Sequence, residues 1–146
     1  MTILLMPSLR CNLKCRYCFE KPVWSSNVAD APANLDAMIG VLKRLIKEYG
    51  RGSVCLHGGE PLTLPIDEIE YLFSTIRKLG CNPSMQTNGT LITDEHIQLF
   101  KKYNVHVGLS VDGPPSIHNL RGERREIAEK VNENLLKMRR AGVSVG

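Results

Sequence analysis

Long apolar runs are missing from this sequence, in which no run exceeds a handful of residues. A helix that crosses a bilayer needs roughly 20 apolar residues, so we expect no membrane span and no membrane partner. The start of the chain also lacks the basic segment that precedes the apolar stretch of a secretory signal. We therefore expect a soluble protein with a cytoplasmic localisation.

Blocks of like charge are absent as well. Lysine and arginine together number 19 against 15 aspartate and glutamate residues, which gives a net charge of +4 and a pI of about 8.9. A nucleic-acid-binding domain usually gathers its basic residues into a patch, and this sequence has no such cluster, so no nucleic-acid partner is expected. The mild positive surplus suits an anionic reductant or substrate.

Cysteine is odd in number and unevenly placed. Of the five cysteines, three fall within residues 11–18, and none follows Cys81. Because disulfides use cysteines in pairs, this distribution favours a reducing compartment over secretion. Cys55 alternates with apolar neighbours and is interpreted as a small core residue.

The sequence does contain a regular alternation of strands and helices within 146 residues, the size of one ordinary domain. Short apolar runs predict strands at residues 3–6, 53–57, 84–87 and 105–111, with a fifth starting at 143–145. Apolar residues three and four apart predict helices that begin after Asn34, near Pro65, after Thr93 and near Ile127. Pro7 is expected to end the first strand.

Each predicted helix is long enough to return the chain to the same end of a parallel sheet. The predicted fold class is therefore α/β, a (β/α) barrel or part of one. Unusual segments follow the strands, at residues 11–18, 58–60, 86–89 and 110–113. Because the C-terminal ends of parallel strands meet at one edge of the sheet, we expect these segments to build one site.

The first of these segments reads Cys11-Asn12-Leu13-Lys14-Cys15-Arg16-Tyr17-Cys18. Three thiols cannot all pair as disulfides, and a zinc site of four ligands would need one more, so a metal cluster with one open position fits better. Soft thiolates favour iron-sulfur clusters, zinc or copper(I). The spacing differs from that of the multi-cluster ferredoxins, in which a fourth cysteine follows closely.

This CxxxCxxC spacing, with the aromatic Tyr17 before the last cysteine, resembles the mark of the radical SAM enzymes. A second match is Gly58-Gly59-Glu60-Pro61, which is similar to the GGEP segment of that family and follows the next expected strand. The resemblance covers nearly the whole chain. It implies that Cys11, Cys15 and Cys18 hold three irons of a 4Fe-4S cluster, and that S-adenosyl-L-methionine (SAM) chelates the fourth iron through its amino and carboxylate groups.

The resemblance also implies contacts to SAM at the ends of the second and fourth strands. Glu60, beside Gly58 and Gly59, would bind the amino group, because a carboxylate suits a cation and glycine lets backbone approach a ligand closely. The plain alternative for the glycine pair is a tight turn. Ser110 would donate to the carboxylate or ribose of SAM, and its plain alternative is a strand-end hydroxyl.

Four further side chains are expected to lie near the cofactor or the substrate. Tyr17 would shield the cluster and lie near the adenine, or simply pack in its loop. Asn88 would line the same cavity, or only form the turn of an Asn-Gly pair. Arg121 suits a carboxylate, although Arg124 and Arg125 fit as well. His57 would be a polar contact to substrate or a core histidine.

The activity implied by the resemblance is reductive cleavage of SAM to a 5'-deoxyadenosyl radical, which then takes a hydrogen atom from a substrate. The motifs are most similar to those of the peptide- and protein-modifying SPASM-type branch, which includes anaerobic sulfatase-maturating enzymes and ribosomal-peptide maturases. The resemblance thus implies a peptide or protein substrate and a flavodoxin- or ferredoxin-like reductant.

Members of that branch have six strand-helix units and a C-terminal extension that holds further clusters. By comparison, residues 1–146 are expected to be the N-terminal part of a radical SAM partial barrel, about four and a half of six units, with the auxiliary-cluster domain absent. Unfinished sheet edges are expected to favour association with another chain.

Other classes of protein remain open at this point. The chain is also compatible with an iron-sulfur electron-transfer or sensing module, with a structural zinc protein, or with an inactive fragment that needs a partner chain. The first of these would leave Glu60 and Ser110 without a role.

Overall fold

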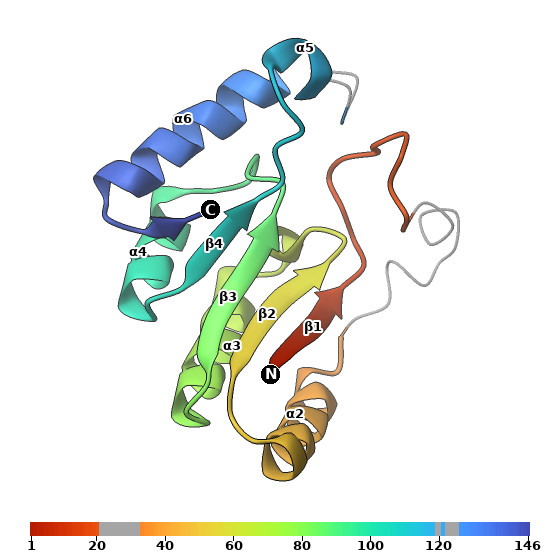
Figure 1. The fold of residues 1–146 in the computed structure, drawn as a ribbon, viewed down its shortest axis with the longest axis vertical. Helices are drawn as coiled ribbons and strands as arrows, with labels where there is room; N and C mark the ends of the chain where they lie inside the picture. The colour runs from red at the N-terminus through yellow and green to blue at the C-terminus, as the bar shows by residue number, and fades with distance from the viewer. Residues whose placement is uncertain (21–32, 119–120, 122–125) are drawn as a thin grey trace.

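The fold is a single parallel sheet with helices packed against it, seen in a computed structural model that describes residues 1–20, 33–118, 121 and 126–146. The five strands lie in the order β1-β2-β3-β4-β5, and each pairs in parallel with the next (Figure 1). Their bounds are β1 Thr2–Ser8, β2 Ser53–Gly58, β3 Asn82–Thr87, β4 His106–Leu109 and β5 Ser144–Val145. The predicted α/β class is confirmed, and the sheet is an open part of a barrel.

Four longer helices connect the strands in the described part of the chain, and two of them begin directly after the predicted capping residues Asn34 and Thr93. They are α2 Leu35–Tyr49, α3 Ile66–Lys78, α4 Asp94–Lys102 and α6 Ile127–Arg140, with the short η2 Pro61–Thr63 and α5 Pro115–His118. At α2, Asn34 Oδ1 accepts from the backbone N–H of Ala37 at 2.9 Å. At α4, Thr93 and His96 form a reciprocal capping box. None of the helices in the described part of the chain is long and apolar enough to span a membrane.

The two faces of the sheet differ in what covers them. Val54, Leu56 and Val107 are fully buried and pack with Phe73 and Phe100 of the helices behind the sheet (Figure 1). Each such side chain contributes about 1.5–3 kcal/mol by leaving water. Successive side chains of a strand point to opposite faces. The residues that alternate with this core set therefore line the other face, which no helix crosses in the described residues.

Cys55 belongs to that uncovered face. It lies between Val54 and Leu56, and its side chain is half-buried, whereas theirs are fully buried. The expectation that Cys55 is a core residue was therefore wrong, because alternation in β2 turns it away from the helices.

Two predicted strand ends also differ from the structure. Strand β1 continues through Pro7 to Ser8. Within the described sheet β1 pairs only with β2, and an edge strand tolerates a residue without an N–H. The register of this pair shifts between Leu5 and Ser8, which takes up the irregularity. Strand β4 ends at Leu109, two residues earlier than expected. Asp112 therefore lies in the loop that follows the strand.

Candidate functional site

A cavity of about 220 Å³ opens at the C-terminal ends of the strands. It is lined by every residue predicted for the cofactor site, namely Cys11, Cys15, Tyr17, Cys18, Gly58, Gly59, Glu60, Asn88, Ser110 and Arg121. The structure thus brings together segments from four strand ends, as parallel topology requires. His57 and Gln86 also line the cavity, from the uncovered face of the sheet.

The cysteine loop, residues 11–18, forms one wall of this cavity. All three of its cysteines are free thiols; Cys15 is buried, and Cys11 and Cys18 are half-buried. Leu13 and Cys15 pack against Ile127 and Val131, two buried residues of α6. The loop is therefore anchored by an apolar contact to a helix that lies more than 100 residues further along the chain.

A closed ring of hydrogen bonds attaches the same loop to the end of β3. Asn88 Nδ2 donates to Asn12 Oδ1 at 2.9 Å, Asn12 Nδ2 donates to Thr90 Oγ1 at 2.8 Å, and Thr90 Oγ1 donates to Asn88 Oδ1 at 2.7 Å. Asn88 is followed by Gly89 with a φ of +77°, as in the predicted turn. Both interpretations of Asn88 therefore describe part of the structure, because it makes the turn and lines the cavity.

The three thiols of the cysteine loop all line this one cavity. Thiolates are soft ligands that suit iron-sulfur centres, so this set of donors fits such a cluster. Burial raises the pKa of Cys11 and Cys15, so a bound cation must displace their protons.

Glu60 also lines the cavity, with a carboxylate on a side chain that is only 1% exposed. Its Oε1 accepts from Thr87 Oγ1 at 2.7 Å and from the N–H of Leu62 at 3.1 Å, and its Oε2 accepts from the N–H of Asn88 at 2.7 Å. Burial raises the pKa of Glu60, while these three hydrogen bonds act in the opposite direction. A buried carboxylate in the lining of a cavity is suited to a positively charged ligand.

The glycine pair before Glu60 is required by a close backbone contact. Gly58 has a φ of +128°, and a Cβ there would lie 2.3 Å from the carbonyl oxygen of Ser8. A Cβ on Gly59 would lie 2.2 Å from the carbonyl oxygen of Arg10. The N–H of Glu60 donates to that same oxygen at 2.6 Å. Both glycines line the cavity, where they were expected to let the backbone approach a ligand, and they also allow close contact with the chain's own backbone as it enters the cysteine loop.

We expect Gly59→Ala to destabilise the chain by about 1–3 kcal/mol, because the new methyl group overlaps the Arg10 carbonyl and pushes the cysteine loop away. The matched control is Gly40→Ala in the middle of α2, where a Cβ meets no atom within 4 Å. That change should stabilise the helix by about 0.5–1 kcal/mol. Urea unfolding of both variants measures the difference, and equal midpoints would contradict the role given to Gly59.

Ser110 lies just after β4 and is held by its neighbours in β3. Its Oγ accepts from Gln86 Nε2 at 2.9 Å, and its N–H donates to the carbonyl of Thr87 at 2.9 Å. The side chain of Gln86 passes over Gly108, where a Cβ would lie 2.3 Å from Gln86 Oε1. In the sequence, Gln86 stands out only as part of the segment 86–89. The glycine opposite it in β4 was the available signal, but it becomes meaningful only once the register Gln86↔Gly108 is known.

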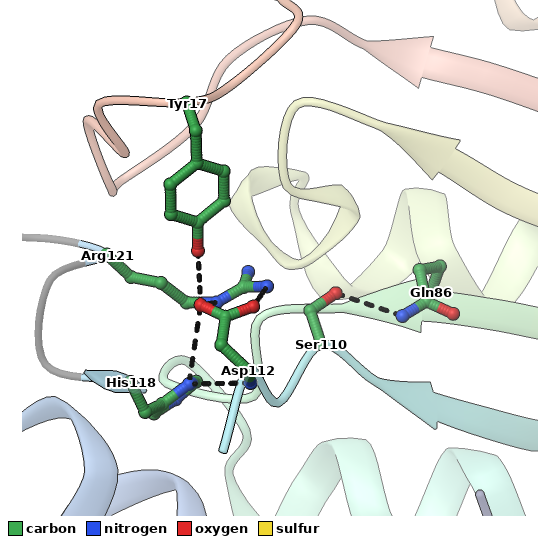
Figure 2. Close-up of polar contacts among 6 residues, drawn as sticks. All are labelled: Tyr17, Gln86, Ser110, Asp112, His118 and Arg121. Carbon is green, nitrogen blue, oxygen red and sulfur yellow. Dashed lines mark hydrogen bonds and ion pairs between the residues drawn. The ribbon is translucent and has the colours of Figure 1, made fainter. Parts of the chain in front are cut away.

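Arg121 lines the cavity, and a charged network with Asp112 and Tyr17 holds its side chain in place (Figure 2). Its Nε donates to Asp112 Oδ2 at 2.7 Å and its Nη2 donates to Asp112 Oδ1 at 2.5 Å. The hydroxyl of Tyr17 donates to Asp112 Oδ2, and the guanidinium carbon of Arg121 lies 5.7 Å from the centre of the Tyr17 ring. Of the three arginines considered, Arg121 lines the cavity, and the other two lie outside the described residues.

Known proteins resemble this chain both in sequence and in fold. A cysteine-type anaerobic sulfatase-maturating enzyme of Clostridium perfringens is 36% identical over 129 residues, which cover 82% of this chain and 35% of that protein. A serine-type anaerobic sulfatase-maturating enzyme of Bacteroides thetaiotaomicron is 32% identical over 122 residues, which cover 75% of this chain and 28% of that protein. The chain therefore spans about a third of the length of these relatives.

A solved structure, native anSMEcpe with bound AdoMet (SAM) and Cp18Cys peptide, superimposes with a TM-score of 0.80 at 30% identity. The match covers 99% of this chain and 41% of that one. The family model of the Radical SAM superfamily matches residues 5–146, which include the cysteine loop, the glycine pair and every strand end of the cavity. This chain belongs to the Radical SAM superfamily.

Proposed function

We propose that residues 1–146 are the cluster- and SAM-binding part of a radical SAM enzyme that modifies a peptide or protein. The observation that carries this proposal is one cavity with three free thiols in one wall and the buried Glu60 carboxylate in another. The thiols suit a 4Fe-4S cluster, and the carboxylate suits the ammonium group of SAM. When bound, cluster and SAM together supply a 5'-deoxyadenosyl radical that abstracts hydrogen from the substrate.

The protein's own residues bind and orient these groups. Cys11, Cys15 and Cys18 would hold three irons, and Glu60 would accept hydrogen bonds from the amino group of SAM. The side chains of Ser110 and Arg121 would face its carboxylate or ribose. Because these donors and acceptors are already fixed by hydrogen bonds, the site needs little rearrangement to bind its ligand.

Two residues of the predicted set have more specific roles. The carboxamide of Asn88 is engaged with Asn12 and Thr90, and its backbone N–H with Glu60, so we assign Asn88 to holding the site in shape. Burial and the hydrogen bond to Asp112 raise the pKa of Tyr17 to about 12, so the phenol keeps its proton at neutral pH. Its exposed ring would cover the cluster side of the cavity and lie near the adenine.

A peptide or protein substrate is supported by the relatives, which are sulfatase-maturating enzymes, and by the solved structure that contains a peptide. The substrate would approach over the uncovered face of the sheet, where His57 and Gln86 border the cavity. The remaining barrel units and an auxiliary-cluster domain would belong to sequence outside residues 1–146. A flavodoxin- or ferredoxin-like reductant, which is acidic, would suit the net charge of +4.

Reductive cleavage of SAM tests this proposal. After anaerobic reconstitution with iron and sulfide, the chain should bind iron and form 5'-deoxyadenosine from SAM in the presence of a strong reductant. Iron without 5'-deoxyadenosine would favour the electron-transfer or sensing alternative. A colourless zinc-loaded protein that takes up no iron would favour the structural alternative.

The affinity for SAM should depend on pH through Glu60. The carboxyl group must be ionised to bind an ammonium, and burial raises the pKa of Glu60, so the protonated form persists to higher pH than in an exposed glutamate. As the pH falls through this raised pKa, SAM should bind up to about tenfold more weakly per pH unit. A pH series of dissociation constants measures this effect. 5'-Methylthioadenosine, which lacks the whole amino-acid part of SAM and therefore its α-amino group, is the control, and an equal pH dependence for both ligands would contradict the assignment.

A further inference from the structure

We propose that Asp112 is a positioning residue for the SAM carboxylate. It acts by fixing the guanidinium of Arg121 and the hydroxyl of Tyr17. This inference rests on the proposed function. Asp112 itself does not line the cavity, whereas Arg121 and Tyr17 both do. Its effect on a ligand would therefore pass through these two neighbours.

The way in which Asp112 binds the guanidinium decides which donors a ligand can use. Asp112 takes the edge of Arg121 that is formed by Nε and Nη2, with its two oxygens at 2.7 and 2.5 Å. The other edge, formed by Nη1 and Nη2, is not part of this pair. A guanidinium is planar and rigid, so an aspartate on one edge fixes the direction of the other. That second edge can bind the two oxygens of another carboxylate.

Tyr17 extends the same network to the cysteine loop. Its hydroxyl donates to Asp112 Oδ2, the oxygen that also accepts from Arg121 Nε (Figure 2). The cysteine loop is thereby attached to the end of β4, in addition to its bond with Asn88 at the end of β3. Just before the loop, the carbonyl of Arg10 accepts from the N–H of Glu60 at the end of β2. The contact at β2 joins backbone atoms, whereas the contact at β4 is made by side chains, and one of these, the charged side chain of Arg121, lines the ligand cavity.

Asp112 is also held from the side of α5. The hydrogen bonds from Arg121 lower the pKa of Asp112, which keeps it charged at neutral pH. Burial lowers the pKa of His118, so its ring is neutral, and its Nδ1 accepts from the N–H of Asp112 at 3.4 Å. The side chains of Arg121 and Asp112 are only 14% and 23% exposed. A pair this buried, with two parallel bonds, is stronger than the isolated surface ion pairs that contribute about 0–1 kcal/mol.

The experiment compares Asp112→Asn with wild type in the anaerobically reconstituted chain. The variant keeps the shape of the side chain but loses its charge and one acceptor. We expect SAM to bind on the order of tenfold more weakly or worse, while iron content is unchanged. Decarboxylated SAM, which lacks only the carboxylate, should bind both proteins equally. A general disturbance of the site would weaken both ligands alike, and that result would overturn the proposal.

Two further variants complete the test. Asp36→Asn removes the partner of another tyrosine hydroxyl, because Tyr71 donates to Asp36 at 2.9 Å far from the cavity, and it should leave SAM affinity unchanged. If Asp112 acts through Arg121, the double variant Asp112→Asn, Arg121→Gln should bind SAM no more weakly than Arg121→Gln alone. Additive losses would contradict the proposal. If wild type holds iron and Asp112→Asn binds SAM as tightly as wild type does, this inference alone is refuted. If wild type holds no iron, the proposed function is refuted as well.

Discussion

Replacement of Cys15 by alanine should abolish binding of the iron-sulfur cluster. Cys15 is the most buried of the three thiols in the cysteine loop, and it lies among Leu13, Ile127 and Val131, where little water can reach. A cluster that loses this ligand would have only Cys11 and Cys18 for its attachment. Two thiolates do not retain a four-iron cluster that normally has at least three protein ligands. Iron and sulfide analysis after anaerobic reconstitution measures the loss.

The matched control for this variant is Cys55→Ala. Cys55 is also a free thiol, but it lies on the uncovered face of β2 and does not line the cavity. Iron content should be the same as in wild type. Iron in the Cys15→Ala variant equal to that in wild type and in Cys55→Ala would show that Cys15 is not a ligand of the cluster.

Replacement of Glu60 by glutamine should reduce SAM affinity on the order of 100-fold while the cluster remains bound. Glutamine has the same shape but no charge, so it cannot balance the ammonium of the ligand in this buried position. The NH₂ of the glutamine would also replace an acceptor oxygen with a donor. It would then face another donor, since all three groups that bind the Glu60 carboxylate are donors. Calorimetric titration of the reconstituted protein with SAM measures the affinity.

The stability of the Glu60→Gln variant separates binding from folding. Loss of a buried charge removes a desolvation cost, which opposes the cost of the mispaired hydrogen bond, so the free energy of unfolding should change by only about 1 kcal/mol. Glu60→Ala leaves the N–H groups of Leu62 and Asn88 without an acceptor and should be markedly less stable. A glutamine variant that binds SAM as tightly as wild type would remove Glu60 from the site.

Much of the fold could be predicted because local pattern and topology agree. The spacing of apolar residues located the helices, and Asn34 and Thr93 marked two of their starts through short-range hydrogen bonds. Parallel topology then required the strand-end segments to meet, which is why the predicted site residues line one cavity. The family assignment needed only two short motifs, and it was confirmed by the match over residues 5–146.

The contacts that fix the site could not be predicted, because they depend on register and on segments far apart in sequence. Asp112 meets Tyr17 across 95 residues, and neither position predicts the other. Gln86 reaches Ser110 only because it lies opposite Gly108. The continuation of β1 through Pro7 depends on the place of β1 at the edge of the described sheet, and the orientation of Cys55 depends on which face of β2 the helices cover. The assignment of each residue to a cofactor atom stays a prediction.

We propose that SAM binds an iron of the cluster through its amino and carboxylate groups within this cavity. Electron-nuclear double resonance of the reduced, reconstituted protein tests this claim most directly, with SAM labelled by ¹⁵N at the amino group or by ¹⁷O at the carboxylate. We expect magnetic coupling of both labels to the cluster in wild type, and loss of the ¹⁵N coupling in Glu60→Gln at matched SAM concentration. A reduced cluster whose spectrum shows no coupling to either label at saturating SAM would contradict the account.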